Sequence, residues 1–219
     1  MRKQLARTLL VAGTVAAAVG FAAPAALAAG TWTVTGGTNF TSAAASGTSF
    51  TLTDATAGAS FTCTVGTGTG TVTDESSGTN TAVGSITAST FGSSAHKCTG
   101  PLGSTGTDTQ KAGTTSTINV ASFSSGTTTG TITGIDHVLT VSSILGTCTA
   151  EVKGTAGVTY TNTSDLLKFT TAGDSLKVTS TSGSCAGIIK VNDVVTFNSG
   201  TGGETVTGSP VNPIQISQP

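Results

Sequence analysis

Threonine alternates with apolar residues along most of this chain, and that two-residue period limits what the chain can fold into. Residues 50–53 read Phe-Thr-Leu-Thr, and 59–65 place Ala, Phe, Cys and Val on one face with Ser and Thr on the other. Neighbouring side chains of a β-strand point to opposite faces, so this pattern predicts strands with one buried face. Threonine favours such strands because its branched Cβ suits a pleated backbone.

The alternating runs are short and end at Gly, Asn, Asp or Ser, which are turn-forming residues. Beyond residue 28, no window combines a 3.6-residue period with a helix-forming composition. We therefore predict an all-β fold, a sandwich or barrel of about a dozen short antiparallel strands, because turns recur every 8–12 residues or so. Apolar residues recur too regularly for a disordered chain, which combines low hydrophobicity with high net charge.

The first 28 residues have the features of a cleaved secretory signal. Three cations fall within the first seven residues, an apolar run spans 9–21, and residues 26–28 supply the small residues that signal peptidase accepts. The alternative is a transmembrane anchor, but the run has about 13 residues and a bilayer requires about 20. We expect a signal peptide at 1–28, secretion to the extracellular space, and no membrane anchor after cleavage.

Charge is scarce in the mature chain that would begin at Ala29. Three cations leave with the signal, so six Lys (9 minus 3) face ten acidic residues, for a net charge of −4. Phosphate binding requires clustered Arg and Lys, so we expect no nucleic-acid partner. The same shortage argues against binding to an anionic membrane surface.

Four cysteines, Cys63, Cys98, Cys148 and Cys185, form an even set that is typical of disulfides outside the cytosol. Three pairings are possible. An approximate internal repeat favours Cys63–Cys98 with Cys148–Cys185, because the cysteine segments recur at offsets of 85 (148 minus 63) and 87 (185 minus 98) residues. A zinc site is disfavoured since no two cysteines lie two to four residues apart. We expect no metal and no cofactor.

The repeat divides the predicted β domain, 29–208, into possible halves at 29–115 and 116–208, followed by a flexible tail at 209–219. Two such halves are either tandem domains or parts of one domain. The one candidate linker, 105–117, contains no Pro and leads directly into another strand, so we favour a single domain.

No group of residues stands out as catalytic. Asp136 and His137 are adjacent, and strand neighbours point to opposite faces, so we expect a turn aspartate and a surface histidine rather than a dyad. The Gly-x-Ser-x-Gly hydrolase motif does not occur in the sequence. The Gly-rich run 66–70 lacks the lysine and the helix of a phosphate loop, so we expect a flexible hairpin there. We predict that the protein is not an enzyme.

Residues 31–37, the runs 127–135 and 158–162, and the paired cysteine segments resemble an uncharacterised group of secreted, Thr/Gly-rich β-proteins from actinobacteria. The likeness covers most of residues 31–200. It implies export and β structure, and it implies no activity, cofactor or functional residue.

Two functional hypotheses follow from these features. The leading one is a non-catalytic extracellular or cell-surface protein, because hydroxyl groups abound while acids, bases and nucleophiles are sparse. Such a surface can hydrogen-bond to cell-wall polysaccharide, or to further copies of the chain through sheet edges with few charges. The alternative is a secreted carrier whose β scaffold encloses a small apolar ligand. The candidate lining of that carrier, which suits an ordinary core equally well, is Phe61, Leu139, Val141, Tyr160 and Phe197.

Overall fold

The structure, a computed structural model, describes residues 31–73, 75–77, 81–209 and 213–218. The signal predicted at 1–28 lies outside these ranges. The described part is all-β, as predicted, and its one helical element is a short 3₁₀ turn, Pro101–Gly103. None of its helical structure is long and apolar enough to span a bilayer.

The described residues form 17 strands, and all their pairings are antiparallel. The strands are β1 (Thr31–Thr35), β2 (Asn39–Ala44), β3 (Phe50–Asp54), β4 (Ser60–Cys63), β5 (Gly66–Val72), β6 (Glu75–Ser77), β7 (Thr81–Phe91), β8 (Cys98–Thr99), β9 (Thr105–Gln110), β10 (Ser116–Ser124), β11 (Thr127–Ser143), β12 (Gly146–Thr161), β13 (Leu166–Thr170), β14 (Leu176–Gly183), β15 (Val194–Asn198), β16 (Glu204–Ser209) and β17 (Gln215–Ser217).

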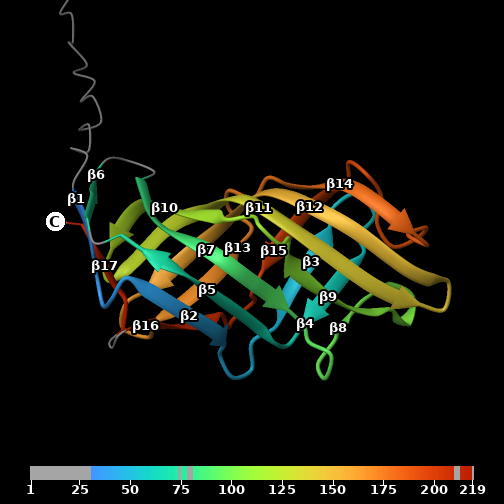
Figure 1. Ribbon diagram of the computed structural model, residues 1–219, viewed down its shortest axis with the longest axis horizontal. Coiled ribbons are helices and arrows are strands. Elements are labelled where there is room, and N and C mark those ends of the chain that lie inside the picture. Colours follow the sequence, from blue (N-terminus) through green and yellow to red (C-terminus); the bar gives the residue numbers. More distant parts are fainter. Residues whose placement is uncertain (1–30, 74, 78–80, 210–212, 219) are drawn as a thin grey trace, which may run out of the picture.

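The strand pairings close into two rings that share β11 and β12. The first ring runs β7-β10-β11-β12-β13-β16-β2-β5 and returns to β7, and the second runs β9-β11-β12-β14-β15-β3-β4-β8 and returns to β9. Figure 1 shows the rings one after the other along the long axis, with β11 and β12 running past both. The pairing therefore follows the barrel alternative of the sequence prediction rather than the sandwich.

Strands β11 and β12, with 17 and 16 residues, are far longer than the short strands expected from the sequence. Their pairing extends from Thr127↔Thr161 to Ser143↔Gly146, with one irregularity between Ile132 and Ile135. Glycines at 130, 134, 154 and 157 interrupt the alternation and resemble turn signals in the sequence. In the structure they lie within one continuous hairpin.

Each ring contains strands from both sequence halves. Strand β16 pairs with β2 in the first ring, and β15 pairs with β3 in the second. Neither 29–115 nor 116–208 therefore forms a ring by itself, and the described parts of the two ranges share one core.

A separate three-stranded sheet, β17-β1-β6, lies at the left end of the molecule in Figure 1. It carries Trp32 and Val34, which are fully buried, and pairs Val34 with Ile216. The flexible tail expected at 209–219 is therefore wrong for Gln215–Ser217, because Ile214 and Ile216 are buried in the core.

Strand β5 corrects the prediction of a flexible hairpin at 66–70. Its glycines face inward and its threonines face outward, and it pairs with both β2 and β7. A Cβ on Gly70 would lie 2.6 Å from the Phe40 ring, and one on Gly66 would lie 2.8 Å from the Phe50 ring. The inward glycines thus leave room for aromatic side chains of the opposite wall.

Four phenylalanines fill the junction between the rings. Phe91 and Phe197 have ring centroids 4.8 Å apart, and Phe50 and Phe169 contact the same pair. Phe91 and Phe169 come from the first ring, and Phe50 and Phe197 come from the second. The two interiors are therefore continuous, and side chains fill the boundary between them.

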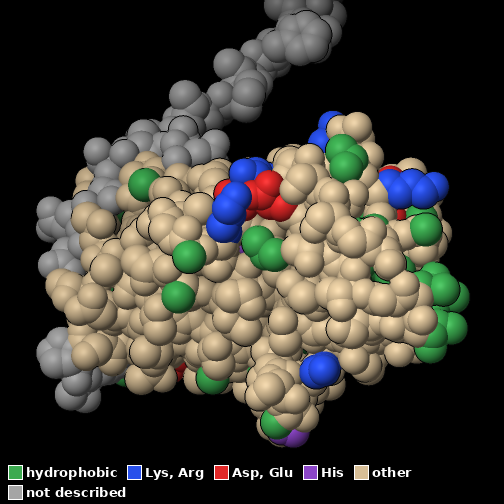
Figure 2. Space-filling view, turned by 45° about the vertical axis from the view of Figure 1, so that its right-hand side comes forward, with side chains coloured by type: hydrophobic (Ala, Val, Ile, Leu, Met, Phe, Trp, Pro, Cys, Tyr) green, Lys and Arg blue, Asp and Glu red, His purple; other side chains and the backbone are tan. Residues whose placement is uncertain are grey.

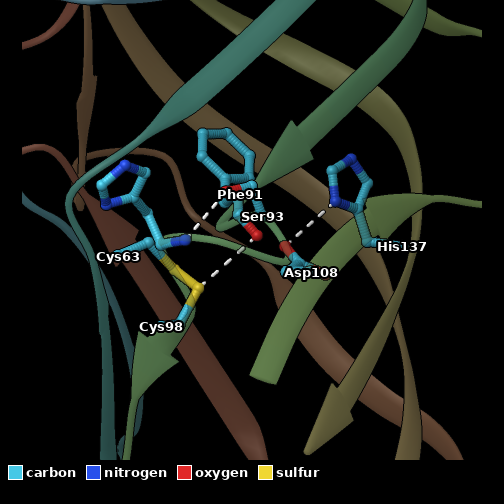
Figure 3. The surroundings of a disulfide bond; sticks show 7 residues. Cys63, Phe91, Ser93, Cys98, Asp108 and His137 are labelled. Atoms are coloured by element: carbon cyan, nitrogen blue, oxygen red, sulfur yellow. Dashed lines mark hydrogen bonds and ion pairs between the residues drawn. A yellow bond between two sulfur atoms is a disulfide. The ribbon is translucent and has the colours of Figure 1, made fainter. Parts of the chain in front are cut away.

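Both disulfides favoured by the repeat are present. Cys63 bonds to Cys98 and Cys148 bonds to Cys185, and no described cysteine is free. Figure 3 shows the first of them close to the side chains of Asp108 and His137. Two disulfides and the lack of a membrane-spanning helix in the described part are compatible with an extracellular protein.

Candidate functional site: a buried Ser–His–Asp cluster

The structure places His137 inside the molecule, which corrects the prediction of a surface histidine. Its side chain is 10 % exposed, and its Nδ1 lies 3.0 Å from Oδ2 of Asp108. Its Nε2 lies 3.0 Å from Oγ of Ser89. The neighbouring Asp136 points elsewhere and pairs with Lys153, so the partner of His137 is Asp108 and not Asp136.

Strand register explains why these residues meet. Strand β9 lies between β7 and β11, with Thr90 opposite Thr109 and His137 opposite Gln110. The next step of the same register brings Ser89 opposite Gln110. Side chains on one face of adjacent strands lie about 5 Å apart, so these inward residues form a contiguous row.

Gln110 is the fourth member of the cluster. Its Oε1 is 3.2 Å from Ser89 Oγ, and its Nε2 donates hydrogen bonds to the carbonyl oxygens of Ile86 and Thr114. These two carbonyls fix the carboxamide with its oxygen towards Ser89. Gln110 thereby also covers the point where β7 leaves β10 and begins to pair with β9.

The single hydroxyl hydrogen of Ser89 cannot be donated to His137 and Gln110 at once. A protonated imidazole donates from Nδ1 to Asp108 and from Nε2 to Ser89, which leaves Ser89 to donate to Gln110. A neutral imidazole protonated on Nδ1 accepts the Ser89 hydrogen instead. The second state is the arrangement in which a histidine acts as general base for a serine.

Two nearby carboxylates strengthen proton binding by the imidazole. Burial by itself lowers the pKa of His137, but the charge and hydrogen bond of Asp108, together with the charge of Asp136, outweigh burial and raise that pKa above its ordinary value. Asp108 Oδ1 has no hydrogen-bond partner among the described residues. The cost of burying the Asp108 carboxylate is therefore offset mainly by the imidazole of His137.

A second buried acid lies across the same space. Glu204 is 3 % exposed and accepts a hydrogen bond of 2.7 Å from Ser42 Oγ. Burial raises the pKa of the Glu204 carboxyl despite that hydrogen bond. Ser42, Ser89, Asp108, His137 and Glu204 all line one internal cavity of about 40 Å³.

That cavity has room for one or two water molecules, since each occupies about 30 Å³ in the liquid. A second, wholly apolar cavity of about 50 Å³ lies within the first ring. Of the proposed carrier lining, Phe197 borders the first cavity and Tyr160 the second, while Phe61, Leu139 and Val141 are buried in the core away from both. Each cavity is therefore bordered by only one residue of the predicted carrier lining.

A larger hollow lies on the outside of the same strands. It has a volume of about 470 Å³, is open to solvent, and most of the residues that line it are Thr or Ser. We call it the hydroxyl groove; its lining is Val65, Gly66, Thr67, Thr90, Gly92, Ser93, Ser94, Thr107 and Thr109.

One sequence pattern could have predicted part of the buried cluster. In β9, Thr105, Thr107 and Thr109 alternate with Gly106, Asp108 and Gln110. If threonine marks the outward face here as elsewhere, Asp108 and Gln110 must face inward, where an acid and an amide are costly without partners. No comparable sequence pattern distinguished Ser89 from the many other serines.

The described residues contain no group of three or more His, Cys, Asp or Glu side chains able to hold a metal ion. We call the hydrogen-bonded row of Ser89, His137 and Asp108 the relay. Comparison with known proteins adds no precedent for it: no family model, curated protein or solved structure matches this chain.

Proposed function

We propose that this is a non-catalytic extracellular protein that binds polysaccharide through its hydroxyl groove. The observation that carries the proposal is the outward row Thr67, Thr90 and Thr109, which are directly paired across β5, β7 and β9. Paired strands hold such hydroxyls about 4.8 Å apart, a spacing comparable with the length of one sugar ring. Hydroxyls fixed in this way can hydrogen-bond to successive sugar hydroxyls with little further loss of entropy.

The outer surface beyond the groove is also suited to a neutral, hydroxylated partner. Figure 2 shows a face on which charged side chains occupy only a few places. On the neighbouring strands, Thr71 bonds to Ser85 at 2.9 Å, and the hydroxyls of Thr69 and Thr87 lie 3.4 Å apart. Neighbouring hydroxyls therefore orient one another, which supports recognition by hydrogen bonds rather than by charge.

The interior gives less support to a carrier of an apolar ligand. Ligand pockets have volumes of about 300–1,000 Å³. The internal cavities next to Phe197 and Tyr160 have about 40 and 50 Å³. We therefore favour a function carried by the outer surface.

Self-association is a second candidate, and the structure favours one place for it. Closed rings leave few free sheet edges, so pairing through edges has little support. The β11–β12 turn, however, carries Ile144 and Leu145, which are 91 % and 53 % exposed. Apolar side chains at a hairpin tip are unusual, and exposed apolar patches often mark contacts.

The polysaccharide proposal is tested by retention on purified cell-wall polysaccharide. The Thr67→Val/Thr109→Val variant keeps the side-chain shape and removes two groove hydroxyls, each worth about 1 kcal/mol if hydrogen-bonded to the sugar. We expect affinity to fall tenfold or more, roughly the effect of 1.4 kcal/mol. A matched Ser122→Ala/Thr129→Val variant, outside the groove, should bind as the wild type does.

Sedimentation velocity separates the two candidates. Loss of a dimer in an Ile144→Ser/Leu145→Ser variant, with no polysaccharide retention by the wild type, would favour self-association. A wild-type protein that neither binds polysaccharide nor associates would contradict both.

A further inference from the structure

In the Ser89–His137–Asp108 relay, the base and the acid lie inside the two rings, and Ser89 in the wall is half-buried. His137 and Asp108 are buried, and the cavity beside them holds about 40 Å³. An external ester or peptide cannot enter such a space. A relay in this position can act only on a group that belongs to the same chain.

Gln110 supplies such a group. Its carboxamide oxygen lies 3.2 Å from Ser89 Oγ, and its nitrogen is held by the Ile86 and Thr114 carbonyls. A rotation of the carboxamide about its Cγ–Cδ bond turns the face of the carbonyl carbon towards the hydroxyl. Ser89 therefore contacts both the base, His137, and the carboxamide of Gln110, while Asp108 contacts the base.

We propose that Ser89 and Gln110 form an intramolecular ester cross-link between β7 and β9, promoted by His137 and Asp108. The cross-link is a self-modification that occurs once per chain, and it does not depend on the polysaccharide proposal.

The chemistry balances without a co-reactant. Neutral His137 takes the Ser89 hydroxyl proton at Nε2 while Oγ bonds to Cδ of Gln110, which gives a tetrahedral intermediate. The intermediate collapses as the Cδ–Nε2 bond breaks, and His137 returns the proton to the leaving nitrogen. One ester and one ammonia molecule replace one hydroxyl and one carboxamide.

The enclosure supports both the formation and the survival of the ester. Reacting groups fixed in contact gain effective molarities of about 10⁵–10⁸ M over free reactants. Asp108 is a positioning residue, since it holds the imidazole with Nε2 towards Ser89. Exclusion of bulk water protects the ester from hydrolysis, while ammonia is small enough to escape during thermal motion of the wall.

The location gives the cross-link a structural purpose. Strand β7 pairs with β10 up to Ile86 and with β9 from Thr90, so Ser89 lies where the wall divides between the two rings. Gln110 bridges this division through hydrogen bonds alone. An ester there joins the two rings covalently, whereas Cys63–Cys98 and Cys148–Cys185 each connect parts of the second ring.

The test is the intact mass of the protein purified from the medium and fully reduced, compared with the mass calculated from its own N-terminus. We expect the wild type to be lighter than its sequence by one ammonia molecule. Ser89→Ala and Gln110→Leu should each restore the full mass. A matched Ser85→Ala variant, which removes another β7 hydroxyl, should keep the loss.

Peptide mapping locates the bond. Trypsin cleaves after Lys97 and Lys111, so after reduction and alkylation Ser89 and Gln110 fall in different peptides. A joined peptide that hydroxylamine separates is the expected result. His137→Gln should form both disulfides and yet lack the joined peptide.

A folded, disulfide-bonded wild type with its full mass and no joined peptide would overturn the proposal. So would an ammonia loss that persists in Ser89→Ala. If the Ser89 and Gln110 variants fail to fold, the wild-type mass and peptide map alone decide the question.

Discussion

Ser89 and Thr90 are consecutive on β7 and point to opposite sides of the sheet: Ser89 contacts His137 inside, and Thr90 lines the hydroxyl groove outside. The two-residue period of the strands therefore places the buried relay and the proposed sugar site back to back on β7 and β9. A cross-link between Ser89 and Gln110 would also hold in register the strands that present Thr90 and Thr109.

The pKa of His137 should depend on Asp108. In Asp108→Asn the charge that raises this pKa is lost while burial, which lowers it, remains, so we expect the imidazole to titrate at lower pH than in the wild type. The imidazole signals of His137 in a pH series of NMR spectra give this value directly. An unchanged His137 pKa would contradict the pairing.

The pairing of His137 with Asp108 also determines the direction in which the free energy of unfolding changes with pH. A folded-state pKa raised above 6.5 means that the folded protein binds the proton more tightly than the unfolded chain. The stabilisation is complete below pH 6.5 and is lost as the pH rises through the folded-state pKa. Chemical denaturation across this window should show the loss in the wild type, and His137→Gln should remove this part of the pH dependence.

Glu204 should destabilise the protein once it is ionised. Burial raises its pKa, so the folded protein binds this proton more tightly than the unfolded chain does. The resulting stabilisation is complete below pH 4.5 and is lost as the pH rises through the folded-state pKa. Glu204→Gln keeps an acceptor for Ser42 and cannot ionise. We expect it to be more stable than the wild type at neutral pH and to show a flatter pH profile, as measured by urea unfolding; equal stability at pH 7 would contradict the buried carboxylate.

Much of this fold was predictable from the alternation of threonine with apolar residues. Phe61 and Tyr160, which suited an ordinary core, are buried, and the cysteine pairing follows the repeat. The alternation acts within single strands and therefore identifies buried faces reliably. It does not determine which strands become neighbours.

The missed features all depend on such long-range pairing. The glycines of β5 resemble a hairpin because their partners, the Phe40 and Phe50 rings, come from other strands. The relay escaped prediction because β7, β9 and β11 supply one residue each, from positions 89, 108 and 137. Adjacent Asp136 and His137 drew attention instead, although neighbours along a strand point apart.

The inward face of β5 should not accept a side chain. In Gly70→Ala the new Cβ would lie 2.0 Å from the Ser85 carbonyl oxygen and 2.6 Å from the Phe40 ring, and a backbone atom cannot give way cheaply. We expect a loss of about 1–3 kcal/mol or more, measured by thermal or urea unfolding. Thr69→Ala, on the outward face of the same strand, should change stability by only about 0.5 kcal/mol.

Each disulfide should contribute substantially to stability. The cysteines are 35 and 37 residues apart, for which the chain-entropy estimate is about 4 kcal/mol per bond. We expect the Cys148→Ala/Cys185→Ala variant to unfold at a clearly lower urea concentration than the wild type. Adding reductant should lower the midpoint of the variant further through Cys63–Cys98, and a midpoint unaffected by either change would contradict this contribution.

The most direct test of the central claim, that the protein works through the hydroxyl groove, is an NMR titration of the labelled protein with cell-wall oligosaccharide. We predict saturable shifts of the backbone amides of Thr67, Thr90 and Thr109, with the β11–β12 tip unaffected. Shifts confined to Ile144 and Leu145, or no shifts at saturating oligosaccharide, would contradict it.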